Sequence, residues 1–314
     1  MGLSRMATRL VAPAEGIPAA AALLASGDVV ALPTETVYGL GAAALDPAAC
    51  AKIFEAKERP LSDPLIVHLP GIDWLERLAE ASAAARELAS RFWPGPLTLV
   101  LPRRSIVPDI VTAGQETVAL RISAHPVFQE VLQTYSKPVA APSANRFGRI
   151  SPTCAQHVID ELDGRIPLIL DGGPCRHGVE STIVLVRGNK LHILRHGPVT
   201  AEELAEFGEV CGAVAGIGAP GGLASHYAPR TPLVIGPADP APGLGLLAWG
   251  SNGAGFEHIE FLSRSGDLRE AAANLYGAMR RLDSGGLKGI VAEPLPEHGL
   301  GAAIMERLRK AAAR

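Results

Sequence analysis

The chain has 314 residues, which is comfortable for two domains, and 47% of them are hydrophobic, enough to bury a substantial core. Its formal net charge of −3 argues against a broad nucleic-acid-binding surface, although it is compatible with a local basic pocket. No apolar run approaches the length of a membrane span, so we expect a cytoplasmic protein without membrane contact.

The four cysteines are scattered along the chain at Cys50, Cys154, Cys175 and Cys211. None belongs to a C-x-x-C pair or follows a histidine at zinc-finger spacing, so we expect no structural zinc site. Unpaired cysteines in a chain of this size are typical of reduced, cytoplasmic thiols.

The first part of the chain alternates apolar strands with helices, which indicates an α/β or α+β architecture. The pattern predicts a helix over 17–25 and a strand over 29–32. Asp46 is a good N-cap for a second helix that has Pro47 at its first position and stops before Pro60. Further strands are expected over 64–69, 97–101, 117–122, 138–141, 167–173, 181–186 and 192–197.

Helices are also expected over 74–92, with a break near Ser82, and over 151–164. The second of these would use Ser151 or Thr153 as its N-cap and Gly164 as its stop. Thr200 and Glu203 form a capping box for the next helix.

A change of composition divides the chain into three parts. Residues 213–231 are rich in Gly, Ala and Pro without any period, which predicts a linker between a first domain over 1–212 and a second over 232–314. The second domain contains four apolar segments and one run of apolar residues at helical spacing, from Leu268 to Leu282. We therefore expect a small α/β domain there.

The stretch "DVVALPTETVYGLG" begins as a buried strand and then becomes polar at Thr34, Glu35, Thr36 and Tyr38. A polar turn and a functional site explain these four residues equally well. The glycines at 39 and 41 would let the chain turn tightly beside them.

Lys52, Lys57 and Arg59 form a cationic cluster toward the end of the second helix, before a strand that carries His68. Cations there suit the negative end of the helix dipole. They could also neutralise a polyphosphate, and lysines are otherwise scarce in this chain.

Arg121 follows Val-Ala-Leu in a strand, where a buried arginine needs a carboxylate partner; the alternative is an edge strand that turns it to water. Ser143, Asn145 and Ser151 lie on a loop that leads to a helix N-terminus, which can bind an anion or merely be capped.

A glycine-rich loop delivers Glu180, Ser181 and Thr182 to the start of a strand. His177 on that loop is either a general base or an exposed histidine. No H-E-x-x-H, G-x-S-x-G or Walker A pattern occurs. The residues thus indicate an enzyme for an anionic nucleotide and a small polar substrate.

Six stretches occur in the order seen in the YrdC/TsaC-like family of L-threonylcarbamoyladenylate synthases, which the chain resembles over about 15–205. They are "ALPTETVYGLG", "KIFEAKERPLSDPLIVHL", "WPGPLTLVL", "VALRISAHP", "PSANRFGRISPT" and "GVESTIVLV". The later "SHYAPRTPL" and the small domain after it resemble the long form of the family, in which a linker lies over the active site.

The resemblance implies a twisted mixed sheet flanked by helices and a small Rossmann-like C-terminal domain. It also implies synthesis of threonylcarbamoyl-AMP and pyrophosphate from L-threonine, bicarbonate or CO2 and ATP, with Mg2+ on the phosphates. The product would pass to the tRNA threonylcarbamoyl-transfer machinery, for modification of adenosine 37 in tRNAs that read ANN codons. Contact with RNA is left open.

The resemblance also implies residue roles. Threonine would contact Thr36, His68, Arg121, Ala141 and Ser181, with Arg121 on its carboxylate. The nucleotide would contact Lys57, Arg59, Asp63, Thr117, Ser143, Ser151, Arg195 and Tyr227. Lys52, Lys57 and Arg59 would form the catalytic cationic wall, and no side chains are expected to bind a metal directly.

The chain departs from the family pattern at Asp63, commonly Asn, at Ser123, often Pro, and in "GGLAS" before His226, where many long forms are basic and aromatic. Two alternatives compete with the synthase. One is a carbamoyl-transfer enzyme, although such enzymes carry an acylphosphatase-like segment and paired-Cys zinc motifs that this chain lacks. The other is a module that binds double-stranded RNA or tRNA through a basic concavity around Lys52, Lys57 and Arg59.

Overall fold

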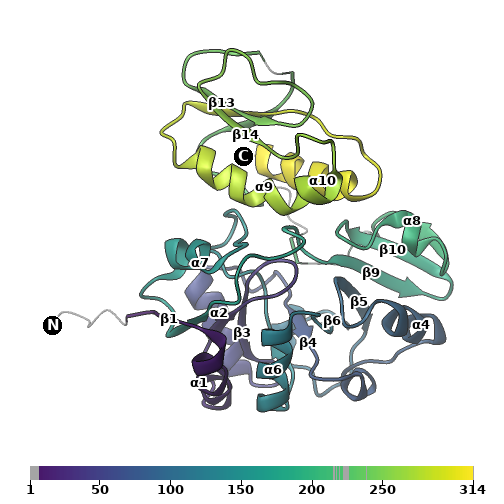
Figure 1. Cartoon of the computed structure of the whole chain (residues 1–314). Coiled ribbons are helices and arrows are strands. Elements are labelled where there is room, and N and C mark those ends of the chain that lie inside the picture. Colours follow the sequence, from purple (N-terminus) through teal and green to yellow (C-terminus); the bar gives the residue numbers. More distant parts are fainter. Residues whose placement is uncertain are drawn as a thin grey trace.

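A computed structural model describes residues 7–214, 216, 218, 220–221, 226–237 and 239–313. The first domain contains an eleven-stranded mixed sheet in the order β1-β8-β2-β3-β7-β4-β6-β5-β9-β10-β11 (Figure 1). Its strands are β1 (Arg9–Val11), β2 (Val30–Leu32), β3 (Gly39–Ala43), β4 (Ile66–His68), β5 (Leu97–Pro102), β6 (Thr117–Arg121), β7 (Val139–Ala140), β8 (Leu168–Leu170), β9 (Thr182–Arg187), β10 (Lys190–Arg195) and β11 (Glu209–Cys211).

Short helices flank this sheet. They are α1 (Pro13–Ala25), α2 (Pro47–Lys57), a 3-10 turn (Ile72–Trp74), α3 (Leu75–Leu78), α4 (Ala83–Phe92), α5 (Asp109–Thr112), α6 (Pro126–Tyr135), α7 (Ala155–Leu162) and α8 (Ala201–Leu204). The α/β class and the mixed sheet predicted from the sequence are confirmed.

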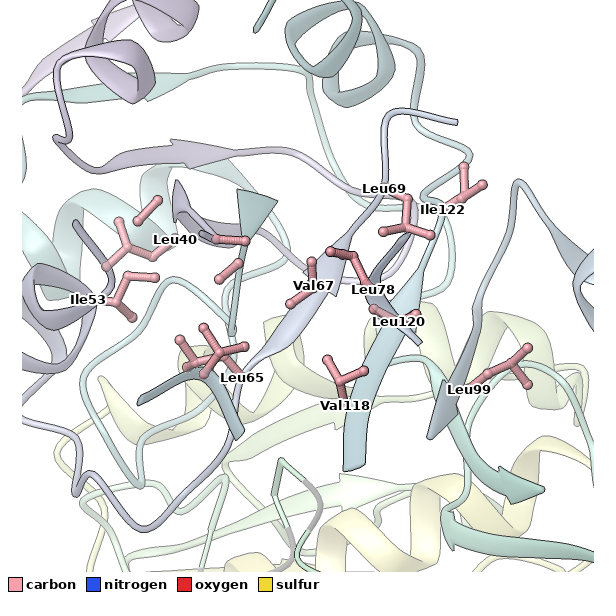
Figure 2. Close-up of a cluster of buried hydrophobic side chains, with 14 of the residues drawn as sticks. Leu40, Ile53, Leu65, Val67, Leu69, Leu78, Leu99, Val118, Leu120 and Ile122 are labelled. Atoms are coloured by element: carbon pink, nitrogen blue, oxygen red, sulfur yellow. The ribbon is translucent and has the colours of Figure 1, made fainter. Parts of the chain in front are cut away.

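The core of the first domain lies where α2, α3 and α4 pack on one face of the central strands. Figure 2 shows its members reaching from β3, β4, β5 and β6 toward one another. On β4, Val67 points into this core, whereas Ile66 and His68 point to the opposite face because successive strand side chains alternate. Burying each large aliphatic side chain stabilises the fold by roughly 1.5–3 kcal/mol.

The C-terminal domain has a four-stranded parallel sheet in the order β12-β15-β13-β14. Its elements are β12 (Leu233–Ile235), β13 (Leu244–Ala248), β14 (His258–Phe261), α9 (Leu268–Asp283), β15 (Gly289–Ala292) and α10 (Leu300–Ala312). Helices α9 and α10 lie between this sheet and the first domain (Figure 1). One apolar cluster joins residues of both helices to Val37, Ile150, Val179 and Tyr227, so the domains share a core at their junction.

Several local predictions hold because short-range chemistry determines them. Asp46 caps α2 by accepting the backbone N–H groups of Ala48 and Ala49, and Pro47 is the first helical residue. Ser82 separates α3 from α4 and caps α4. Thr200 and Glu203 form the capping box of α8.

Two local predictions are wrong. Helix α7 begins at Ala155 after Cys154, and neither Ser151 nor Thr153 caps it, since no side chain caps this helix. Gly39 and Gly41 do not form a tight turn; they lie within β3. A Cβ atom on Gly41 would lie 2.9 Å from a methyl group of Val139, so these glycines let β7 approach closely.

Candidate active site

A pocket lies on the face of the central strands opposite the core, the face to which Ile66 and His68 point. It combines residues from the loop after β2, from β4, β6 and β10, from the segment after β7, and from the linker. Its lining consists of Thr34, Thr36, Val37, Gly39, Arg59, Ile66, His68, Arg121, Ala141, Pro142, Ser143, Glu180, Ser181, Arg195, Pro220, Gly221, His226 and Tyr227.

Arg121 is buried at the end of β6 and is held on three sides. Its Nη2 atom lies 2.7 Å from Oε1 of Glu35, Nη1 donates to Oγ1 of Thr36 at 3.0 Å, and Nε donates to the carbonyl of Gly95 at 3.1 Å. The carboxylate partner expected for a buried arginine is therefore Glu35, and the edge-strand alternative is excluded because β4 and β5 flank β6.

Charge states at this end of the pocket follow from the same contacts. Burial alone would raise the pKa of Glu35, but the Arg121 guanidinium and the Ser123 hydroxyl lower it to about 2. Burial, together with the nearby Arg121 charge, lowers the pKa of His68 to about 3. Glu35 is thus an anion at neutral pH, and His68 is a neutral imidazole that packs against Phe128.

Arg195 and Ser181 line the same pocket and contact each other. Arg195 donates to the carbonyl and to Oγ of Ser181, both at 3.0 Å, and Nη1 donates to the carbonyl of Pro220 at 3.1 Å. Ser181 also shares a 2.8 Å hydrogen bond with Thr98. Within the described part of the chain, Arg195 is buried without a carboxylate partner. A desolvated guanidinium of this kind favours an anionic ligand.

Arg59 also lines the pocket and is already paired. Its Nη2 atom lies 2.9 Å from Oδ2 of Asp63, and the guanidinium also donates to the carbonyls of Asp63 and Pro64. Asp63 therefore orients Arg59 toward the pocket rather than lining the pocket itself.

Two residues of the predicted linker, His226 and Tyr227, line the pocket and are both buried. Burial and the neighbouring Glu180 carboxylate raise the pKa of Tyr227 to about 12, so its hydroxyl stays protonated. Among the described residues, that hydroxyl has no hydrogen-bond partner, and it can donate to a ligand. Of the "GGLAS" departure, Gly221 is described and residues 222–225 lie outside the described residues.

The structure does not bring every expected residue to the pocket. Lys52 is exposed and pairs with Asp28 at 3.4 Å. Lys57 is buried, but its Nζ donates to the carbonyls of Ser143 and Asn145 and so shapes the loop behind the pocket. Three further expected nucleotide ligands, Asp63, Thr117 and Ser151, do not line it either.

These positions also bear on the RNA alternative. Lys57 and Arg59 are buried and Lys52 is neutralised by Asp28, so the three cations form no common exposed surface.

His177 is half-buried on its loop and does not line the pocket.

Sequence reasoning missed the roles of Glu35, Glu180 and Thr98. Each acts through a partner distant in the sequence, as Glu180 does through Arg307, 127 residues away. The available signal was their polarity at the ends of apolar strands, which did not identify their partners.

No group of three or more His, Cys, Asp or Glu side chains that could hold a metal ion occurs in the described part of the chain. The carboxylates nearest the pocket are committed to arginines: Glu35 to Arg121, Asp63 to Arg59 and Glu180 to Arg307. These residues do not fit a metal held by the protein alone. No helix within the described residues has the length and apolar character to cross a membrane.

Comparison with known proteins agrees with this geometry. The family model that groups Sua5, YciO and YrdC, described as "Telomere recombination", matches residues 22–197. A second model, described as "Threonylcarbamoyl-AMP synthase, C-terminal domain", matches residues 199–313.

Individual relatives match over nearly the whole chain. A protein of Pyrococcus abyssi named threonylcarbamoyl-AMP synthase is 42% identical, with 93% of this chain and 92% of that protein covered. A Bacillus subtilis protein of the same name is 41% identical, with 94% and 92% covered. The crystal structure of P. abyssi Sua5 complexed with L-threonine superposes with a TM-score of 0.88 at 38% identity, covering 97% of this chain and 98% of that one.

Proposed function

Because the chain belongs to the Sua5–YciO–YrdC family and carries its threonylcarbamoyl-AMP synthase C-terminal domain, we propose that it makes threonylcarbamoyl-AMP. The substrates would be L-threonine, ATP and bicarbonate or CO2. The observation that carries this proposal is a single pocket lined by two buried arginines, Arg121 beside Thr36 and Arg195 beside Ser181.

Threonine would occupy the Arg121 end. Nη1 of Arg121 donates to Thr36 and Nη2 is ion-paired with Glu35, which leaves further N–H groups to donate to the substrate carboxylate. His68 and Ala141 would complete the walls of this subsite, and Ser181, which Arg195 contacts, would border both subsites. A neutral His68 neither repels the ammonium form of threonine nor competes with Arg121 for its carboxylate.

ATP would occupy the Arg195 end, where Arg59, Ser143 and Tyr227 also line the pocket. We no longer place Lys52 in this set because it is exposed and paired, and we assign Lys57 to shaping the Ser143–Asn145 loop. Asp63 and Ser151 would act indirectly, through Arg59 and Glu180. Magnesium would be bound by the phosphates of ATP and by water.

The reaction needs positioning more than covalent help from the protein. The threonine ammonium first loses a proton to water; the free amine then bonds to CO2 and releases a second proton to give a carbamate anion. A carbamate oxygen then bonds to the α-phosphorus while the bond from that phosphorus to the pyrophosphate oxygen breaks. Negative charge grows on the departing pyrophosphate, where Arg59 and Arg195 stabilise it. The linker residues His226 and Tyr227 would exclude water from the reactive adenylate.

We further propose that 213–231 acts as a lid between a catalytic domain over 1–212 and the domain over 232–314. The product would be handed in the cytoplasm to tRNA threonylcarbamoyl-transfer machinery, for adenosine 37 of tRNAs that read ANN codons. Direct contact of this chain with RNA is not required for that transfer.

The test is pyrophosphate release by the purified chain with ATP and Mg2+. We expect release only when L-threonine and bicarbonate are both present. ATP-independent binding of double-stranded RNA without turnover would overturn the proposal in favour of a binding module. Consumption of carbamoyl phosphate would instead favour a carbamoyl-transfer enzyme.

A further inference from the structure

Glu180 connects the pocket to the C-terminal domain. It immediately precedes Ser181, lines the pocket and is buried. Its carboxylate accepts hydrogen bonds from Ser151, from the hydroxyl of Tyr276 at 3.0 Å and from Nε of Arg307 at 2.8 Å. Tyr276 lies on α9 and Arg307 on α10, so two of the three donors that fix this carboxylate come from the second domain (Figure 1).

Arg307 also holds the segment that follows Arg195. Its Nη2 atom donates to the carbonyl of His196 at 2.8 Å, and the neighbouring Glu306 accepts the backbone N–H of His196 at 2.9 Å. Arg307 thus contacts Glu180, which precedes Ser181 in the sequence, and His196, which follows Arg195. Arg307 thereby sets the spacing between the start of β9 and the end of β10.

The same side chains support the linker. The guanidinium carbon of Arg307 lies 5.1 Å from the ring centroid of Tyr227, and the Tyr276 ring stacks on that ring with centroids 5.9 Å apart and planes at 28°. Tyr227 lines the pocket, and within the described part of the chain its hydroxyl has no hydrogen-bond partner.

Holding the two domains together does not by itself require a buried arginine and a buried tyrosine hydroxyl at their junction. Arg307 and Tyr276 are each 0% exposed, and a buried charge is costly unless its partners are well placed. Apolar side chains of similar size can hold two surfaces together as well as a buried ion pair does. A planar guanidinium instead fixes several acceptors at defined angles, which is a positioning property.

We propose that Arg307 is a positioning residue of the active site, assisted by Tyr276, and that the C-terminal domain is therefore a working part of the catalytic pocket. The inference rests on the proposed function, which it deepens by giving the second domain a role. Arg307 acts through Glu180, His196 and Tyr227 and need not touch a substrate.

The experiment compares Arg307→Met and Tyr276→Phe with Arg309→Met in the full chain. Arg309 is the matched control, because it lies on the same helix but is half-exposed and pairs with Glu297 at the surface. The kinetic constants for ATP and threonine are measured well below each variant's unfolding midpoint. We expect kcat/KM for ATP to fall about tenfold to a hundredfold in Arg307→Met, as for a displaced catalytic geometry, with no change in Arg309→Met.

Tyr276→Phe removes one donor from Glu180 but keeps the ring against Tyr227, so it answers the question if Arg307→Met does not fold. We expect its kcat/KM for ATP to fall at least threefold while its unfolding midpoint stays near that of the unmodified chain. A merely structural role would shift midpoints and leave the constants of the folded protein unchanged. If Arg307→Met folds, a kcat/KM for ATP within twofold of Arg309→Met would overturn the proposal; if it does not fold, the same result for the folded Tyr276→Phe variant would overturn it.

Failure of the proposed function would look different. In that case the unmodified chain and Arg309→Met would both release no pyrophosphate. Calorimetric binding of ATP would then decide the positioning role: binding at least tenfold weaker in Arg307→Met, or threefold weaker in Tyr276→Phe, supports it, and unchanged binding contradicts it.

Discussion

Glu35 and Arg121 form a buried charge pair that organises the threonine end of the pocket. Their side chains are 8% and 3% exposed, so neither charge can be left to water when the other is removed. Losing one partner of such a pair typically costs 3–5 kcal/mol, far more than the pair itself contributes relative to an apolar replacement.

Variants of this pair can separate an effect on threonine binding from an effect on the stability of the fold. We expect Arg121→Gln to raise the KM for threonine by roughly tenfold to a hundredfold, because a charge-assisted contact to the substrate carboxylate is lost, with little change in the KM for ATP. The same variant should be destabilised because Glu35 remains buried and unpaired. Steady-state kinetics and urea unfolding measure the two effects.

The double variant Glu35→Gln/Arg121→Gln is the control. It should recover much of the lost stability, because no unpaired charge remains, but not the affinity for threonine. If Arg121→Gln binds threonine normally while folded, Arg121 does not hold the substrate carboxylate.

At the scale of elements, the linker depends on close contact between Gly221 and Tyr227. Gly221 has φ +78, and a Cβ atom there would lie 2.2 Å from the Tyr227 hydroxyl. Gly216 has a similar φ of +83, but a Cβ atom there would meet nothing within 4 Å.

We therefore expect Gly221→Ala to lower kcat/KM for ATP by about tenfold, since it displaces Tyr227. Gly216→Ala carries the same backbone strain without the clash, and its activity should stay near that of the unmodified chain. Equal kinetic constants in the two variants would show that the position of Tyr227 does not matter for turnover.

The elements that could be predicted from the sequence are those determined by residues close together in the chain. Helix α2 followed from Asp46 and Pro47, because caps act within one turn. The strand character of Gly39 and Gly41 did not, because only the approach of β7 explains two glycines inside a strand. Helices α6 and α10 were missed, although Phe128, Val131 and Leu132 are buried at helical spacing in α6.

The site shows the same division. The resemblance implied nine residues that the structure brings to one pocket: Thr36, Arg59, His68, Arg121, Ala141, Ser143, Ser181, Arg195 and Tyr227. The resemblance placed Lys52 and Lys57 in the cationic wall, but Lys52 pairs with Asp28 and Lys57 donates to the loop of Ser143 and Asn145. The roles of Glu35 and Glu180 depend on partners that only the folded chain brings near.

For the whole molecule, the first domain has a core of its own, since its two largest clusters contain residues only up to Val210. We expect a fragment ending at residue 212 to fold but to turn over at least tenfold more slowly, because it lacks Tyr227 and Arg307. Circular dichroism and the pyrophosphate assay measure the two properties. Full activity in the folded fragment would contradict a lid role for the linker.

Stability of the whole chain should fall as the pH drops from about 6.5 to 3. Burial lowers the pKa of His68 and of His226 to about 3, from an unfolded value near 6.5. In this window the unfolded chain binds more protons than the folded chain, so acid favours unfolding. Each histidine contributes a slope of up to about 1.4 kcal/mol per pH unit.

Urea unfolding at pH 7.5 and pH 5 measures this dependence. Replacing His226 by Gln should reduce the slope, and replacing the exposed His258 by Gln provides the control. Below about pH 4.5 a further loss is expected, because Glu35 and Glu180, whose pKa values are lowered to about 2, must take up protons on unfolding. A free energy of unfolding that does not change between pH 7.5 and 5 would contradict this assignment.

The most direct measurement is the fate of isotopically labelled bicarbonate. The purified chain is incubated with 13C-bicarbonate, L-threonine, ATP and Mg2+, and the adenylates are examined by mass spectrometry. The account predicts one adenylate that contains threonine, AMP and the labelled carbon, formed together with pyrophosphate. Hydrolysis of ATP at the same rate without threonine, with no labelled adenylate, would contradict it.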